Sequence, residues 1–164
     1  MSDGLLITAC IHMINFRKRH FLSQLTGLAV CSVANGVQAR VTPSQSLGPF
    51  YPIKLPLDSN ADLTFVEGKK GTASGHIVNL SGQVFSENGG FVPRALIEIW
   101  QCDAFGAYHH PRDGGGLDPF FQGYGMAITD DEGRYRFRTI KPVAYPGRAP
   151  HIHLRISSNS KELI

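Results

Sequence analysis

Cysteine, charge and long apolar runs are all scarce in this sequence. Its 164 residues include three cysteines, and only Cys102 lies beyond residue 39, so no disulfide can form within that later part. Charged residues make up 18% of the chain. No segment after residue 39 has the roughly 20 predominantly apolar residues that a membrane-spanning helix requires, and none shows the apolar stripe of an amphipathic helix. A disulfide framework, a membrane span and a helical bundle are therefore excluded there.

The first 39 residues have the composition of a leader. A basic patch at residues 17–20 precedes an uncharged stretch, residues 21–39, which ends in a small residue. A basic head, an apolar middle and a small residue before the cut are the three parts of a secretory signal peptide. We therefore expect residues 1–39 to direct export, with the periplasm as destination, and residues 40–164 to form one mature domain. A retained anchor or a disordered leader is the alternative.

Two details of the leader bear on its route and on the charge of the mature chain. Lys18-Arg19 resembles a twin-arginine signal with lysine in place of the first arginine. The twelve residues before Met13 contain no Lys or Arg, which favours Met13 as the true start. The whole chain has a net charge of +3, but residues 40–164 hold 13 Lys+Arg and 12 Asp+Glu, a net of +1. We therefore expect no nucleic-acid partner, and no membrane association of the mature form.

From Gly75 onward the chain alternates short β-like runs with Gly- and Pro-rich turns. In residues 134–140 the first six residues alternate arginine with Tyr, Phe or Thr, and Ile140 follows, which is the period of a half-buried strand. Strands this short at this spacing predict an all-β fold, an antiparallel β-sandwich. The expected strands are residues 76–80, 83–86, 96–100, 125–129, 134–140 and 151–156.

The two ends of the mature part have a different character. Residues 40–73 are rich in Pro, Ser, Leu and Asp without a sustained period, so we expect an extended arm that crosses the core. The chain stops within a run that looks like another strand, and about 125 residues would give such a sandwich a marginal core. We therefore expect a fragment whose sandwich lacks its C-terminal strands.

His151-Ile152-His153 is the sharpest local signal for chemistry. Residues i and i+2 of a strand point to the same face, so both imidazoles would project together and could grip one metal ion. A pair of surface histidines is the plainer alternative, and on this spacing alone zinc is the default metal. The prolines and the glycine between Tyr145 and His151 bend the chain so that the tyrosine can return to the histidines. Tyr108, beyond the end of the strand at 96–100, offers a second tyrosine.

Taken together, these residues form a pattern that resembles the intradiol ring-cleavage dioxygenases, which open catechol rings. The pattern is Trp100-Gln101-x-x-x-x-Gly106-x-Tyr108 followed by Tyr145-Pro146-Gly147-Arg148-x-Pro150-His151-Ile152-His153. Within that family, Thr42-Pro43-Ser44-Gln45 with Gly48-Pro49-Phe50-Tyr51 is similar to the start of the protocatechuate 3,4-dioxygenase branch. The resemblance runs from about Thr42 to the end of the chain.

The resemblance implies a non-haem iron enzyme. One Fe(III) per chain would be bound by Tyr108, Tyr145, His151 and His153, while Arg148 beside the substrate and Tyr145 as a base would be catalytic. The substrates would be O2 and a small aromatic diol such as protocatechuate, and the product a cis,cis-muconate. The chain would assemble with itself or with a related subunit. Two features depart from the family pattern, namely a short spacer between the second tyrosine and the first histidine, and the missing final strands.

Two other functions are consistent with parts of the pattern. The framework would also suit a non-catalytic, transthyretin-like binding sandwich, and His151 with His153 could belong to a zinc-binding hydrolase or a cupin-like protein. Phenolate oxygen is a hard donor that suits ferric iron, whereas a zinc site would more usually recruit Cys or carboxylate. A tyrosinate-bound ferric ion colours a protein, so colour and metal content separate the three.

Overall fold

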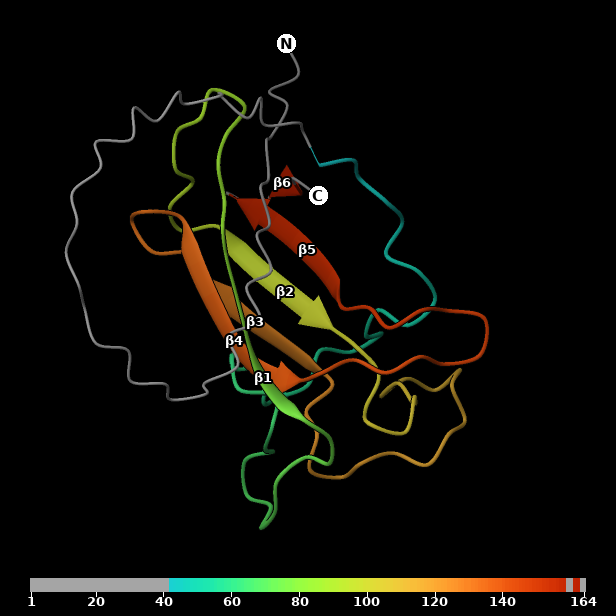
Figure 1. Ribbon diagram of the computed structural model, residues 1–164. Helices are drawn as coiled ribbons and strands as arrows, with labels where there is room; N and C mark the ends of the chain where they lie inside the picture. The colour runs from blue at the N-terminus through green and yellow to red at the C-terminus, as the bar shows by residue number, and fades with distance from the viewer. Residues whose placement is uncertain (1–41, 159–160, 163–164) are drawn as a thin grey trace, which may run out of the picture.

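Six strands and no helix make up the regular structure of the described residues, 42–158 and 161–162, in a computed structural model (Figure 1). They form two antiparallel sheets, one of order β1-β4 and one of order β3-β2-β5-β6. The predicted all-β antiparallel fold is thereby confirmed. The strands are β1 (Ile77–Gln83), β2 (Leu96–Trp100), β3 (Tyr124–Ile128), β4 (Arg134–Ile140), β5 (His153–Ser158) and β6 (Lys161–Glu162).

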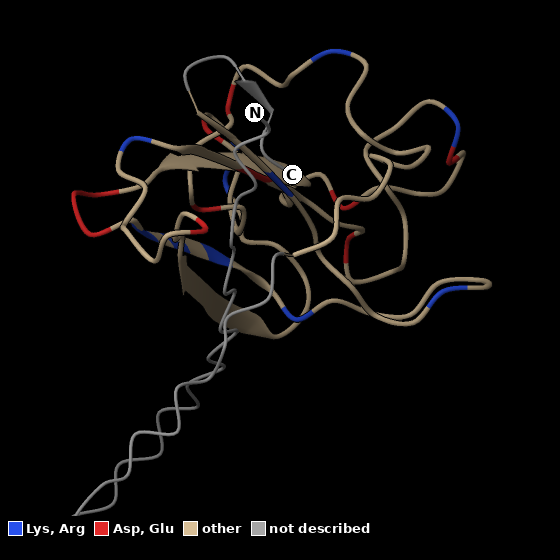
Figure 2. Cartoon of the chain, turned by 90° about the horizontal axis from the view of Figure 1, so that it is seen from above, with Lys and Arg blue, Asp and Glu red and all other residues tan. Residues whose placement is uncertain are grey.

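The leader predicted for residues 1–39 lies outside the described residues. Within the part that is described, no helix is long and apolar enough to cross a membrane. Basic and acidic residues are interspersed around the molecule in Figure 2, and neither sign gathers in one region.

The main hydrophobic core lies between the two sheets. Ile97 and Ile99 from β2 and Ile156 from β5 are fully buried, and they share this core with Leu80 of β1 and Phe137 of β4. In β4 the tyrosine, phenylalanine and threonine are buried, while its three arginines are exposed. The two-residue period read from the sequence therefore places the apolar face of this strand against the other sheet.

β1 differs from the sequence-based expectation, which put a break at Ser81-Gly82 between two separate runs. The strand continues through these residues to Gln83, and Gly82 pairs with Tyr135 of β4. A Cβ atom on Gly82 would collide with the ring of Tyr135. The glycine is therefore a site where a cross-strand ring lies close to the backbone, which is one of the reasons for glycine inside a strand.

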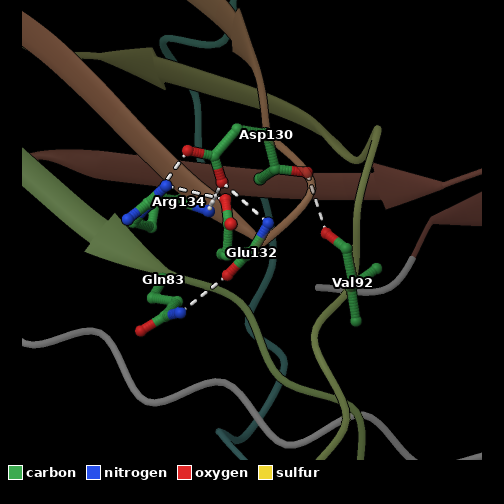
Figure 3. A network of polar contacts seen from close by, with 6 residues as sticks. Gln83, Val92, Asp130, Glu132 and Arg134 are labelled. Carbon is green, nitrogen blue, oxygen red and sulfur yellow. Dashed lines mark hydrogen bonds and ion pairs between the residues drawn. The ribbon is translucent and has the colours of Figure 1, made fainter.

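A polar turn joins β3 to β4, as the sequence predicts. Gly133 has a φ of 72°, and its N–H donates to the carbonyl oxygen of Asp130 at 2.9 Å. Figure 3 shows the Arg134 guanidinium between Asp130 and Glu132, with nitrogen–oxygen distances of 2.9 and 2.7 Å. Gln83 from β1 donates to the carbonyl oxygen of Glu132 at 2.6 Å. The turn is thus tied to the C-terminal end of β1, the strand that pairs with β4.

The face of β2 that points away from the main core is covered by the segment that precedes β1. Phe50 and Tyr51 belong to no strand, yet they pack with Trp100 of β2 and Tyr124 of β3 in a second cluster of buried rings. The described residues of this segment, 42–76, contain no strand. It runs past the start of β5 toward the loops that follow β2 (Figure 1).

Asp118, in the long loop between β2 and β3, ties that loop to the segment before β1. Its carboxylate accepts hydrogen bonds from the backbone N–H of Ser74 at 2.7 Å and of Phe120 at 2.9 Å. Burial opposes the charged form, but these hydrogen bonds outweigh it and lower the pKa of Asp118. Since the folded protein holds this proton more weakly than the unfolded chain, the carboxylate stabilises the fold at neutral pH, and the contribution is lost as pH falls through the lowered pKa.

We therefore expect Asp118→Asn to lower the free energy of unfolding at pH 7 by about 1–2 kcal/mol, and to match the wild type below the lowered pKa. Urea unfolding between about pH 2.5 and 7 measures this. Asp131→Asn, which changes an exposed carboxylate in the β3–β4 turn, is the control. A difference between Asp118→Asn and the wild type that stays constant across this range would contradict the assignment.

Candidate metal centre

The side chains singled out in the sequence come from three separate stretches that meet at one end of the sandwich. Tyr108 lies in the loop after β2, and Tyr145 in the connection from β4 to β5. His153 is the first residue of β5, and His151 precedes it by two positions. In Figure 1 these two loops and the start of β5 gather on the same side of the molecule.

The four side chains form one cluster. The phenol oxygen of Tyr108 lies 3.4 Å from Nε2 of His151, which lies 3.2 Å from Nε2 of His153. The ring of Tyr145 packs edge-on against that of Tyr108, with centroids 5.5 Å apart, and lies 5.5 Å from the ring of His151. The structure therefore brings together all four residues that the sequence nominated as metal ligands.

The histidine pair is placed somewhat differently from the sequence-based expectation of a strand that begins at His151. The strand β5 begins at His153, whose partner in the ladder is Trp100, the last residue of β2. Beyond Trp100 the chain leaves the sheet, so His151 has no partner on that strand. Its ring is oriented instead by a contact of 2.6 Å between Nδ1 and the carbonyl oxygen of Ala149. Because a carbonyl only accepts, the ring proton lies on Nδ1, and Nε2 keeps a lone pair.

Arg148 is held close to the cluster by a tight turn. Its backbone N–H donates to the carbonyl oxygen of Tyr145 at 2.9 Å, and Gly147 between them has a φ of 81°. The Arg148 side chain is exposed. Burial raises the pKa of Tyr108, and the positive charge of Arg148 opposes that rise. Burial lowers the pKa of His153, and the charge of Arg148 adds to that fall. The guanidinium is thus the cation that flanks this cluster.

Two rings that the sequence did not assign to the site stack against its members. Phe50 stacks on Tyr108 with centroids 4.5 Å apart and an interplanar angle of 14°, and Trp100 stacks on His153 at 4.8 Å and 5°. Trp100 was part of the sequence motif, but its spacing gave no hint of this role. Phe50 likewise stands in the motif Gly48-Pro49-Phe50-Tyr51, but its contact joins positions far apart in the chain, so the motif alone did not predict it.

Burial shifts the pKa of two members of the cluster in opposite directions. Burial, followed by the neighbouring Tyr145, raises the pKa of Tyr108 far above its ordinary range. Burial, followed by the electrostatic effects of the neighbouring His151 and Arg148, lowers the pKa of His153 to about 4. At neutral pH the imidazole is therefore uncharged and able to donate a lone pair. The phenol of Tyr108 would ionise only beside a strong cation.

The donor set fits a hard, highly charged metal ion. It combines two phenol oxygens with two imidazole nitrogens, and phenolate is a donor that suits ferric iron. The described residues contain no group of three or more His, Cys, Asp or Glu side chains that could hold a metal ion. A zinc centre usually draws at least three ligands from those types, so any metal held here would depend on Tyr108 and Tyr145.

A small cavity of about 90 Å³ adjoins the cluster. Its walls include the rings of Phe50, Trp100, Tyr108 and Tyr124, and Lys54 also lines it. None of its lining residues is acidic, and Lys54 forms no ion pair within residues 42–158. Nε1 of Trp100 is buried and has no acceptor among the described residues. The cavity therefore has an aromatic wall and a lysine without an ion-pair partner in the described part of the chain, a combination suited to an anionic aromatic ligand.

Comparison with known proteins gives consistent matches. A family model described as Dioxygenase matches residues 47–164. The beta chain of protocatechuate 3,4-dioxygenase from Burkholderia cepacia is 44% identical over 110 residues, which is 62% of this chain and 46% of the relative. Catechol 1,2-dioxygenase from Candida albicans is 31% identical over 138 residues, covering 73% of this chain and 44% of the relative. The chain thus spans about half the length of the curated relatives it matches.

The fold has solved counterparts as well. The dioxygenase domain of a dioxygenase carbohydrate-binding protein fusion from Streptomyces sp. SirexAA-E superposes with a TM-score of 0.57 at 29% identity. That match covers 73% of this chain and 68% of the other. The all-β sandwich and the sequence motifs therefore point to the same group of proteins.

Proposed function

The chain belongs to the intradiol ring-cleavage dioxygenase family, and from this premise we propose that the protein opens the ring of a catechol-type diol with O2, using one Fe(III) per chain. The observation that carries the proposal is the convergence of Tyr108, Tyr145, His151 and His153 on one point from three stretches of sequence. A binding sandwich without catalysis gives no reason for two phenols and two imidazoles to meet there.

The four clustered side chains would hold the metal ion, which the donor chemistry described above supports. Bound Fe(III) would supply the electron-withdrawing centre that makes the diol ring reactive toward O2. Tyr108 is 2% exposed and stacked against Phe50, so it is suited to a fixed ligand. Tyr145 is only half-buried, so as a tyrosinate it would be the ligand able to move aside and accept a proton from an incoming diol. Arg148 would stabilise negative charge on the diol.

Among catechol-type diols, we propose one with a carboxylate on the ring, of which protocatechuate is the simplest. The support is the cavity beside Tyr108, where the ammonium of Lys54 has no ion-pair partner in the described residues and no lining residue is acidic. The similarity to a protocatechuate dioxygenase beta chain agrees with this choice. That relative is called a beta chain, which also supports assembly of this protein with itself or with a related subunit.

Purified protein from iron-supplied cells provides the test. We expect about one iron per chain, a visible absorption band from tyrosinate bound to iron, and O2 uptake with a ring-opened product that carries two new carboxylates. The KM for protocatechuate should be lower than that for catechol. Lys54→Met should reduce the ratio of the KM for catechol to the KM for protocatechuate about tenfold. A charge-assisted contact contributes about 1.5 kcal/mol, and one tenfold step is about 1.4 kcal/mol.

Lys54→Arg is the matched control, since it keeps the positive charge and should keep most of the preference. A colourless, iron-free protein would count against the enzyme itself. An active enzyme whose KM values for the two diols do not respond to Lys54→Met would leave the activity standing and rule out this carboxylate contact.

A further inference from the structure

A buried carboxylate lies close to the candidate metal centre without touching any of its four side chains. Glu98 of β2 is 3% exposed. Its Oε1 accepts hydrogen bonds from the hydroxyls of Tyr51 at 2.7 Å and Tyr124 at 2.6 Å. Its Oε2 lies 3.2 Å from Nη1 of Arg155, which also donates to the Tyr51 hydroxyl at 3.1 Å. We name these four residues the Glu98 cluster.

Such a cluster is costly to place in a fold. Burying a charge carries a desolvation penalty of several kcal/mol, which an ion pair repays only if its geometry and its hydrogen bonds are good. An apolar residue on β2 would fill the same place without that penalty. A buried ion pair is therefore weak as a device for stability alone, and its value has to be sought in what it positions.

The register of the sheet places the Glu98 cluster one step from the histidine. Glu98 pairs with Arg155 across β2 and β5, and Trp100 pairs with His153. Residues two apart on a strand point to the same face, so all four side chains lie on the outer face of the sheet. Trp100 stacks flat on His153, and the ring of Tyr51 packs edge-on against Trp100 at 5.0 Å and 83°. The chain of contacts thus runs from Glu98 through Tyr51 and Trp100 to the imidazole.

A second chain of contacts reaches the buried phenol. Phe50, the residue before Tyr51, stacks on Tyr108 at 4.5 Å and lies edge-on to Tyr145 at 6.3 Å. Phe50 and Tyr51 lie outside every strand, so no sheet ladder fixes them. The Tyr51 hydroxyl, held by Glu98 and Arg155, is the polar anchor of this dipeptide. Fixing Tyr51 also restricts Phe50, because consecutive residues share one peptide plane.

We propose that Glu98 is a positioning residue of the metal centre. Through Tyr51 it holds the Phe50-Tyr51 dipeptide against Tyr108 and Trp100, and so fixes the orientation of one phenol and one imidazole. The inference rests on the proposed function, in that the oriented side chains are metal ligands. Loss of the groups that orient metal ligands typically costs 10- to 100-fold in metal affinity, and the same range is expected here.

The test measures how fast full-length, iron-loaded protein releases iron to a chelator in the absence of substrate. Tyr51→Phe keeps the ring and removes the anchoring hydroxyl, and Glu98→Gln keeps the shape and removes the charge. We expect each to release iron about 10- to 100-fold faster and to shift the tyrosinate-to-iron absorption band. If Glu98→Gln does not fold, Tyr51→Phe alone still decides the matter, because it removes a single oxygen atom.

Asp62→Asn is the matched control. It breaks another ion pair that ties the segment before β1 to a sheet, that of Asp62 with Arg138 at 3.0 Å, but this pair lies on β4. The control should lower the free energy of unfolding and leave iron release unchanged.

Three outcomes overturn the proposal. Wild-type rates in Tyr51→Phe, with an unshifted band, would mean that Glu98 only supports the fold, while the metal centre itself would stand. Equal acceleration in Asp62→Asn would mean that any loosening of this segment releases iron. A wild-type protein that binds no iron overturns both the positioning role and the proposed function.

Discussion

Tyr108→Phe should give a colourless protein that retains little iron and consumes O2 with protocatechuate at least about 1000-fold more slowly. The substitution removes one hydroxyl but keeps the buried ring that stacks on Phe50, so the fold should survive. A bound metal ion contributes several kcal/mol to a reaction of this kind, and each 1.4 kcal/mol is a factor of ten in rate. His151→Gln should have the same effect, because it removes the imidazole whose Nε2 lies 3.4 Å from the phenol oxygen.

Metal analysis, the visible spectrum and an oxygen electrode check this expectation together. Tyr135→Phe is the matched control, since Tyr135 is a buried tyrosine of the main core rather than of the cluster. It should keep its iron, its colour and its rate. A Tyr108→Phe protein that stays coloured and active would show that the phenol is not a ligand, and the proposed reaction would then lack its centre.

Phe137→Ala should lower the free energy of unfolding by about 3–5 kcal/mol, the range for truncating a buried phenylalanine. Phe137 is fully buried in β4, and it pairs with Leu80 of β1 in the core between the sheets. A small domain has about 5–15 kcal/mol in total, so the variant would be close to unfolding at ambient temperature.

Urea unfolding of the wild type and of Phe137→Ala at the same pH measures the difference in the free energy of unfolding. Phe105→Ala is the control, since Phe105 is 71% exposed on the loop after β2. Its loss should change the free energy of unfolding by about 0.5 kcal/mol or less. A Phe137→Ala protein as stable as this control would mean that the two sheets do not share a tightly packed core.

The sequence predicts those elements whose pattern is local. The strands at residues 96–100 and 134–140 have the predicted bounds, because alternation and flanking turn residues both act within a few positions. The break expected at Ser81-Gly82 is absent, because the glycine makes room for the ring of Tyr135 on another strand and does not end the strand. The strand expected from His151 begins at His153, because its partner β2 ends opposite that residue. Local patterns hold no information on either point.

The candidate site divides in the same way. Its four proposed ligands and Arg148 stand in short motifs, so they could be nominated from the sequence. The contact of Glu98 with Tyr51 could not, although Tyr51 itself stands in a motif, because the hydrogen bond that joins them spans 47 positions. A glutamate between two isoleucines and a tyrosine in a proline-rich arm both resemble solvated residues until the arm is folded over the sheet. Supporting contacts of this kind become visible only in three dimensions.

The two faces of β2 also determine how the sheet can be assembled. Ile97 and Ile99 belong to an apolar compartment, while Glu98 and Trp100 belong to one that contains hydroxyls and an arginine. A slip by one residue would place a carboxylate in the apolar compartment and an isoleucine among the hydroxyls. Misaligned pairings of this strand are therefore penalised on both sides at once. Because the slipped registers of β2 are penalised, the point at which the Tyr108 loop leaves the sheet is fixed as well.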